Sequence, residues 1–128
     1  MGPMVVLGSI TADRRASSVE FLRRYVDGTL DTAGVDAEDV RLVVSELGTN
    51  AVTHGSGERV GLFVAANDDC VRVEVTDGGG GSPRERRAEA EDEGGRGLMI
   101  VTAVAEHWGV RRDERGTTVW AEVARRPR

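Results

Sequence analysis

The sequence contains no lysine, and all 17 of its basic residues are arginine. Without a lysine ammonium group the chain can form neither a Schiff base nor a Walker A phosphate loop. It also lacks the lysine with which ordinary protein kinases contact phosphate. Any nucleotide bound by this protein must therefore be held by other groups.

Cysteine, basic clusters and long apolar runs are also scarce. Cys70 is the one cysteine, so an internal disulfide is impossible. No apolar stretch is long enough for a signal peptide or a membrane span, and we predict a cytoplasmic protein. The formal net charge is -5 and the arginines are scattered, which argues against direct binding of nucleic acid.

The length of 128 residues predicts one domain that spans the whole chain. Apolar residues recur at helical spacing in two early segments and alternate in later ones. We expect a first helix that is capped by Ser17 or Ser18. A second helix should be capped by Asp36 and stop at Gly55. The expected third helix begins near residue 97, and the expected strands cover residues 4–10, 60–64, 71–75, 108–112 and 117–124. This order predicts an α+β two-layer sandwich, with a mixed, mostly antiparallel sheet and helices on one face.

Within the second expected helix, Glu46 and Asn50 project about 40° apart and lie beside the apolar stripe. A carboxylate and an amide at the border between core and solvent suit a hard cation or a polarised water. The same spacing is common on a solvated helix edge. The pair alone leaves both interpretations open.

A second motif follows strand 71–75, where Asp77 precedes four consecutive glycines. Asp77 could accept hydrogen bonds from the exocyclic amine of a base, and the glycines leave room for the ring. An Asx-type turn would use the same residues. Thr117, at the start of the last strand, could bridge to a ligand beside Asp77, but threonine is also an ordinary strand residue.

A third motif, Gly95, Arg96 and Gly97, precedes the third expected helix. Free backbone N–H groups at a helix start favour a phosphate, and Arg96 could add a bidentate contact. The glycines could equally serve as hinges for the preceding loop, which is glycine-rich and then charged.

Taken together and in order, four segments resemble the Bergerat-fold, or histidine-kinase-like, ATPases: gyrase, the heat-shock chaperone, histidine kinases and anti-sigma serine kinases. The segments are ELGTNAVTHG (46–55), TDGGGG (76–81), GRGL (95–98) and GTTVWAEV (116–123). The match spans roughly residues 40–123 and is most similar to the anti-sigma kinase branch.

This resemblance implies ATP and Mg²⁺ as cofactors. Asn50 would ligate Mg²⁺, and Glu46 would orient or deprotonate the attacking hydroxyl or water. Asp77 would read the adenine amine with support from Thr117. The remaining nucleotide contacts would be Gly79 and Gly81, which line the base and start an ATP lid at about residues 78–96, and Gly95, Arg96 and Gly97, which hold phosphates.

The anti-sigma branch implies a serine/threonine kinase that phosphorylates an anti-sigma antagonist protein, sequesters a sigma factor and so regulates transcription by partner switching. Members of the family commonly pair, and strand 4–10 could present an edge for a homodimer. Glu93 stands where we would look for an arginine, and the glycine run favours weak ATP binding. Both features favour an alternative, a nucleotide-gated binding module with little or no kinase activity; a purely structural interaction domain is a third interpretation.

Overall fold

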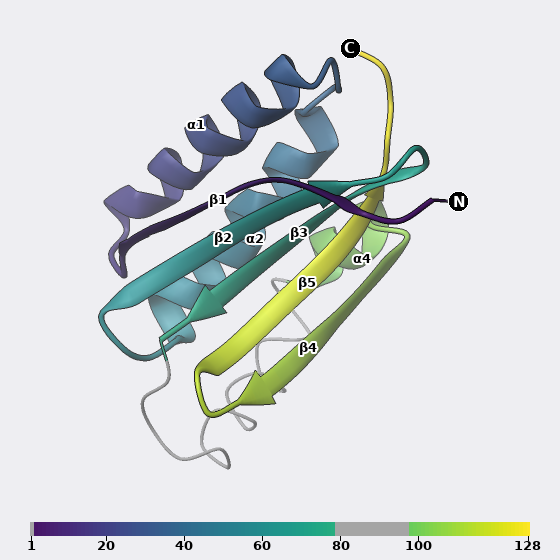
Figure 1. Cartoon of the computed structure of the whole chain (residues 1–128). Coiled ribbons are helices and arrows are strands. Elements are labelled where there is room, and N and C mark those ends of the chain that lie inside the picture. Colours follow the sequence, from purple (N-terminus) through teal and green to yellow (C-terminus); the bar gives the residue numbers. More distant parts are fainter. Residues whose placement is uncertain (1, 79–97) are drawn as a thin grey trace.

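The computed structural model describes residues 2–78 and 98–128. They form a five-stranded sheet in the order β1-β2-β3-β5-β4, with helices packed against it (Figure 1). The elements are β1 (Val5–Asp13), α1 (Ser17–Thr32), α2 (Glu38–His54), β2 (Arg59–Ala66), β3 (Cys70–Asp77), α4 (Leu98–Val104), β4 (His107–Asp113) and β5 (Gly116–Ala124). The predicted α+β sandwich is confirmed, and β1 is an edge strand as expected. The described strands pair only in antiparallel fashion, so the sheet is not mixed there.

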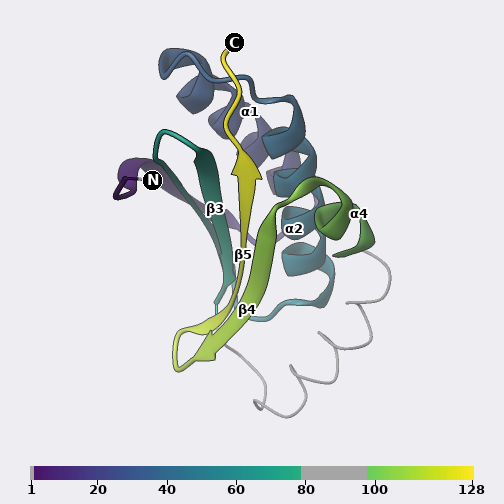
Figure 2. The same cartoon turned by 90° about the vertical axis from the view of Figure 1, so that its right-hand side faces the viewer.

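The helices lie together on one side of the sheet (Figure 2). Each long helix buries an apolar stripe, which consists of Leu22, Val26 and Leu30 in α1 and of Val40, Val43, Val44 and Leu47 in α2. The side chains that meet these stripes alternate along β2 and β3, because successive strand residues point to opposite faces. None of the helices in the described ranges is long and apolar enough to cross a membrane.

The helix starts differ from the prediction. The N-cap residues are Ala16 and Ala37, and neither helix start has a side-chain cap. Ser17 and Ser18 already lie inside α1, where a hydroxyl cannot act as the cap of its own first turn. Asp36 precedes the cap of α2 by one residue, although its Oδ1 accepts a hydrogen bond from the Glu38 N–H at 3.3 Å. Gly55 ends α2 as predicted.

Two hairpins account for the antiparallel pairing of four strands. Between β2 and β3, the Asn67 side chain accepts hydrogen bonds from the N–H groups of Asp69 and Cys70, both at 2.8 Å. Between β4 and β5, the Asp113 carboxylate accepts the N–H of Arg115 at 2.8 Å. Such side-chain contacts to the backbone are what make Asn and Asp favourable in turns.

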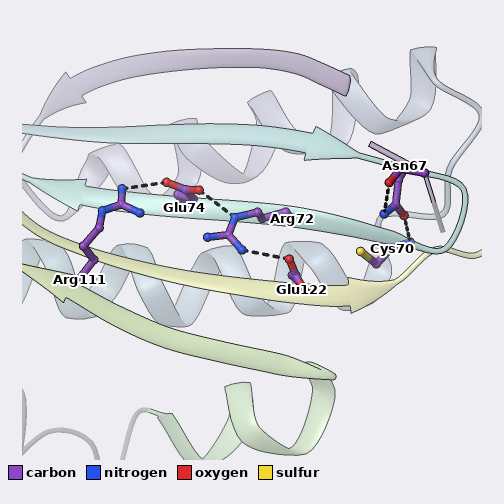
Figure 3. Close-up of polar contacts among 7 residues, drawn as sticks. Asn67, Cys70, Arg72, Glu74, Arg111 and Glu122 are labelled. Atoms are coloured by element: carbon purple, nitrogen blue, oxygen red, sulfur yellow. Dashed lines mark hydrogen bonds and ion pairs between the residues drawn. The ribbon is translucent and has the colours of Figure 1, made fainter. Parts of the chain in front are cut away.

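The face of the sheet away from the helices carries a chain of charged side chains (Figure 3). Arg72 donates to Glu74 at 2.8 Å and to Glu122 at 2.9 Å, and Arg111 donates to Glu74 at 3.3 Å. The Arg72 guanidinium also lies over the Trp120 ring, 4.3 Å from its centroid. Burial alone would lower the pKa of Arg72, but its two carboxylate partners raise that pKa above the ordinary value. Each charged side chain in this network therefore has an oppositely charged partner within it.

Candidate functional site

Three polar side chains lie side by side at the end of the sheet where β3 stops. Thr117 of β5 pairs with Arg112 of β4, and Asp77 lies one step beyond the Thr76–Thr118 pair, which places it opposite Thr117. Paired residues of neighbouring strands project to the same face. Val60, the β2 partner of Asp77, belongs to the core, so this is the face that the helices cover. We call Asp77, Thr117 and Arg112 the polar row.

Asp77 and Thr117 of the polar row are buried and Arg112 is partly buried, and the row still contains buried polar atoms without a hydrogen-bond partner in the described residues. Asp77 is 7% exposed, and its carboxylate accepts a hydrogen bond from the Ser56 hydroxyl at 3.4 Å. Thr117 is 8% exposed, and its buried Oγ1 has no partner among residues 2–78 and 98–128; the same holds for the buried Nε of Arg112. A buried polar atom left without a partner costs about 1–3 kcal/mol, and native proteins rarely keep one without a reason. The row therefore retains hydrogen-bonding capacity for a ligand.

The end of α2 packs closely against the end of β3. A side chain at Gly55 would place its Cβ 2.8 Å from the Cβ of Asp77. Gly57 has φ +79°, and a Cβ there would lie 2.7 Å from the carbonyl carbon of Gly78. The Gly78 N–H in turn donates to the Ser56 carbonyl at 2.9 Å. Only glycine permits both this backbone conformation and this approach, so the Gly55–Gly57 segment determines how the helix end meets Asp77.

Arg14 connects this loop to the start of α1. Its guanidinium donates to the carbonyls of Gly57 and Val52, both at 2.7 Å, and its N–H donates to the Glu58 carbonyl at 2.8 Å. Sequence reasoning missed Arg14, because its partners lie 38 and 43 residues away along the chain. It also missed Ser56 and Arg112, although the position of Ser56 between two glycines after a helix is a usable loop signal.

Glu46 and Asn50 lie one turn apart on α2, and both are half-buried. At about 1.5 Å per residue, Asn50 lies roughly 7.5 Å and Glu46 roughly 13.5 Å along the helix axis from Gly55, which abuts Asp77. Within the described ranges neither side chain takes part in a hydrogen bond or an ion pair. The helix thus presents an amide and then a carboxylate at increasing distance from the polar row.

The described residues contain no group of three or more His, Cys, Asp or Glu side chains that could hold a metal ion. A Mg²⁺ ion that takes most of its ligands from phosphates and water needs no such cage, and one amide oxygen such as that of Asn50 suits it. Five further predicted contact residues lie outside the described residues, as does the predicted lid beyond Gly78. They are Gly79, Gly81, Gly95, Arg96 and Gly97.

The chain belongs to the histidine kinase-like ATPase domain family, whose sequence model matches residues 12–123. The family predicted from the four motifs is thereby confirmed, and membership implies ATP binding. Solved structures with a similar fold include the crystal structure of the RsbU and RsbW domains of Rv1364c from Mycobacterium tuberculosis, with a TM-score of 0.65 and 24% sequence identity. That match covers 98% of this chain but 33% of the other, so the chain spans about a third of its length. None of the curated proteins compared with the chain matches it.

Proposed function

We propose that the polar row holds the adenine of ATP and that the chain is an ATP-dependent serine/threonine protein kinase of the anti-sigma type. The observation that supports this most is the buried Asp77 carboxylate beside the partnerless hydroxyl of Thr117. Asp77 accepts a hydrogen bond from the adenine amine, and Thr117 supplies the hydroxyl that bridges to the ring. ATP provides the phosphoryl group that is transferred.

The order of residues along α2 supports the roles proposed for the rest of the site. Asn50 would contribute its amide oxygen to Mg²⁺, an ion that would neutralise phosphate charge. Glu46, one turn farther from the adenine end, accepts the proton of the attacking hydroxyl group. Gly79 and Gly81 belong to the base-binding loop in this proposal, and Gly95, Arg96 and Gly97 contact the phosphates.

The proposed protein substrate is a small anti-sigma antagonist, and the proposed second partner is a sigma factor, held in an alternative complex in the cytoplasm. This assignment rests on the resemblance of the four motifs to the anti-sigma kinases. Partner switching of this kind regulates transcription without any contact to DNA.

Phosphotransfer can be tested with Mg-ATP and the candidate antagonist. Glu46→Gln keeps the size of the side chain but removes its basic carboxylate, and we expect a loss of transfer of at least about 100-fold. The matched control is Glu38→Gln, which changes an exposed carboxylate at the other end of the same helix and should leave transfer intact. Undiminished transfer by Glu46→Gln would remove Glu46 from the mechanism.

A nucleotide-gated binding module without kinase activity is the second candidate, favoured by Glu93 where an arginine is expected. The same assay separates the two functions. A wild-type chain that binds ATP and its partner, but transfers no phosphate, is the binding module. In that case Asp77→Asn should weaken the binding of both nucleotide and partner.

We also propose that the chain forms a homodimer through β1. This strand lies at the sheet edge, and Val5 and Val6 are each 62% exposed. An unpaired edge with apolar side chains favours association. Light scattering after gel filtration should report a dimer for the wild type and a monomer for Val5→Glu/Val6→Glu. Leu42→Glu on α2, also an exposed apolar position, is the control and should remain dimeric. A monomeric wild type would refute the proposal.

A further inference from the structure

Arg112 lies in the polar row but belongs to none of the four motifs that identify the family. Its neighbour Arg111 points to the open face of the sheet, where it reaches Glu74 (Figure 3). Because successive strand residues alternate, Arg112 points to the face covered by helices. Its pairing with Thr117 places it on the same face as that buried threonine.

The hydrogen bonds of the other arginines show what an arginine with a structural role looks like in this protein. Arg14 donates to two backbone carbonyls, and Arg72 to two carboxylates. The Nε of Arg112 is buried yet has no partner in the described part of the chain. Leaving such a donor unpaired is costly, and it costs more for a charged group than for a neutral one. The unpaired Nε of this partly buried arginine is therefore available to a ligand.

The position of Arg112 decides which part of a nucleotide it can contact. Neighbouring strands lie about 4.8 Å apart, so the backbones that carry Asp77 and Arg112 are roughly 10 Å apart, with Thr117 between them. No ion pair joins Asp77 to Arg112 in the described residues, although the two charges are opposite and share one row. Asn50 and Glu46 lie on α2 instead, along the helix from Gly55, so the phosphate end of the ligand is expected there. Arg112 is therefore placed at the end of the site where the base is proposed to lie.

Adenine suits an acceptor and a donor placed on one row. Its amine donates, and its ring nitrogens accept, whereas guanine carries acceptors at both O6 and N7 on the same edge. Asp77 pairs with a donor and repels an acceptor such as O6. A guanidinium group supplies the complementary donor to a ring nitrogen.

We propose that Arg112 positions the base by donating a hydrogen bond to a ring nitrogen of the adenine held by Asp77. The inference rests on the proposed nucleotide site and adds a residue to it. Arg112 contributes affinity, whereas Asp77 selects adenine over guanine. Thr117 lies between the two and contacts the same ring.

The test measures nucleotide affinity by isothermal titration calorimetry for the wild type, Arg112→Met and Arg111→Met. Methionine keeps an unbranched side chain but removes every donor. We expect Arg112→Met to bind ATP about tenfold more weakly, which corresponds to a hydrogen bond from a charged group. Arg111→Met should bind ATP like the wild type, because Arg111 lies on the opposite face and Glu74 retains Arg72 as a partner.

Deaza analogues of ATP separate direct contact with the base from a merely structural effect. The 1-, 3- and 7-deaza compounds each replace one ring nitrogen by a carbon that cannot accept a hydrogen bond. The wild type should bind one of them about tenfold more weakly than ATP, and Arg112→Met should bind that analogue and ATP equally well. If Arg112→Met does not fold, as judged by circular dichroism, Arg112→Leu, which also lacks any donor, is measured in the same way.

The outcomes distinguish this inference from the proposed function. A wild type that binds no ATP refutes the nucleotide site and the role of Arg112 together. A wild type that binds ATP, loses affinity with Asp77→Asn and keeps it with Arg112→Met refutes the role of Arg112 alone. If the wild type binds all three deaza analogues as tightly as ATP, the role of Arg112 is likewise refuted.

Discussion

Thr117→Val should make the protein without ligand more stable and its nucleotide binding weaker. Valine has nearly the shape of threonine but no hydroxyl. The Thr117 hydroxyl is buried without a partner in the described residues, so its removal relieves a cost of about 1 kcal/mol in the free energy of unfolding. The same hydroxyl is proposed to contact the nucleotide, and the loss of one such bond, worth about 1 kcal/mol, weakens binding roughly fivefold. Urea denaturation and calorimetric titration with ATP measure the two quantities.

Thr118→Val is the matched control for this prediction. Thr118 is 4% exposed, and its hydroxyl bonds to that of Thr76 at 2.8 Å on the opposite face of the sheet. Its replacement leaves Thr76 without that partner and should lower the free energy of unfolding by about 1 kcal/mol, with unchanged ATP affinity. A Thr117→Val protein destabilised as much as Thr118→Val would refute this prediction, because the Thr117 hydroxyl would then already be bonded in the free protein.

Replacement by alanine should change the free energy of unfolding in opposite directions at two glycines. At Gly48, inside α2, a Cβ would meet Leu22 Cδ1 at 3.5 Å, an ordinary contact, so Gly48→Ala should raise the free energy of unfolding by about 1 kcal/mol through helix propensity. A lower urea midpoint for this variant would contradict the packing described here. At Gly57 the positive φ and the contact with Gly78 should make Gly57→Ala destabilising by about 2 kcal/mol or more and should weaken ATP binding. Unchanged stability and affinity would show that the loop beside Asp77 adapts freely.

Most helices and strands follow from local patterns. The alternation around Val60 and Val71 predicts the β2–β3 hairpin, and the helical spacing up to Gly55 predicts α2 and its end. The first strand is longer than predicted, because its apolar run stops at Ile10 whereas its pairing with β2 continues to Asp13. An ion pair between Asp13 and Arg59, at 2.7 Å, accompanies that extension. Such a contact depends on the neighbouring strand and has no local signal.

In the candidate site, too, some features have a local sequence signal and others depend on tertiary contacts. Asp77 and Thr117 stand out in the sequence through their glycine neighbours, and the resemblance to a known family connects them. Their placement opposite each other depends on the β3–β5 register, between strands that are not consecutive along the chain. Arg112 enters the row only through its pairing with Thr117, and Arg14 reaches the loop only through long-range hydrogen bonds. Tertiary contacts of this kind cannot be read from residue spacing.

Titration of the wild type and of Asp77→Asn with Mg-ATP tests the nucleotide site most directly. The wild type should bind ATP, and Asp77→Asn should bind about tenfold more weakly, because a charge-assisted hydrogen bond becomes a neutral one, while circular dichroism confirms an unchanged fold. Failure of the wild type to bind ATP at millimolar concentration, or equal affinity of the two proteins, would contradict the assignment of the polar row as the adenine site.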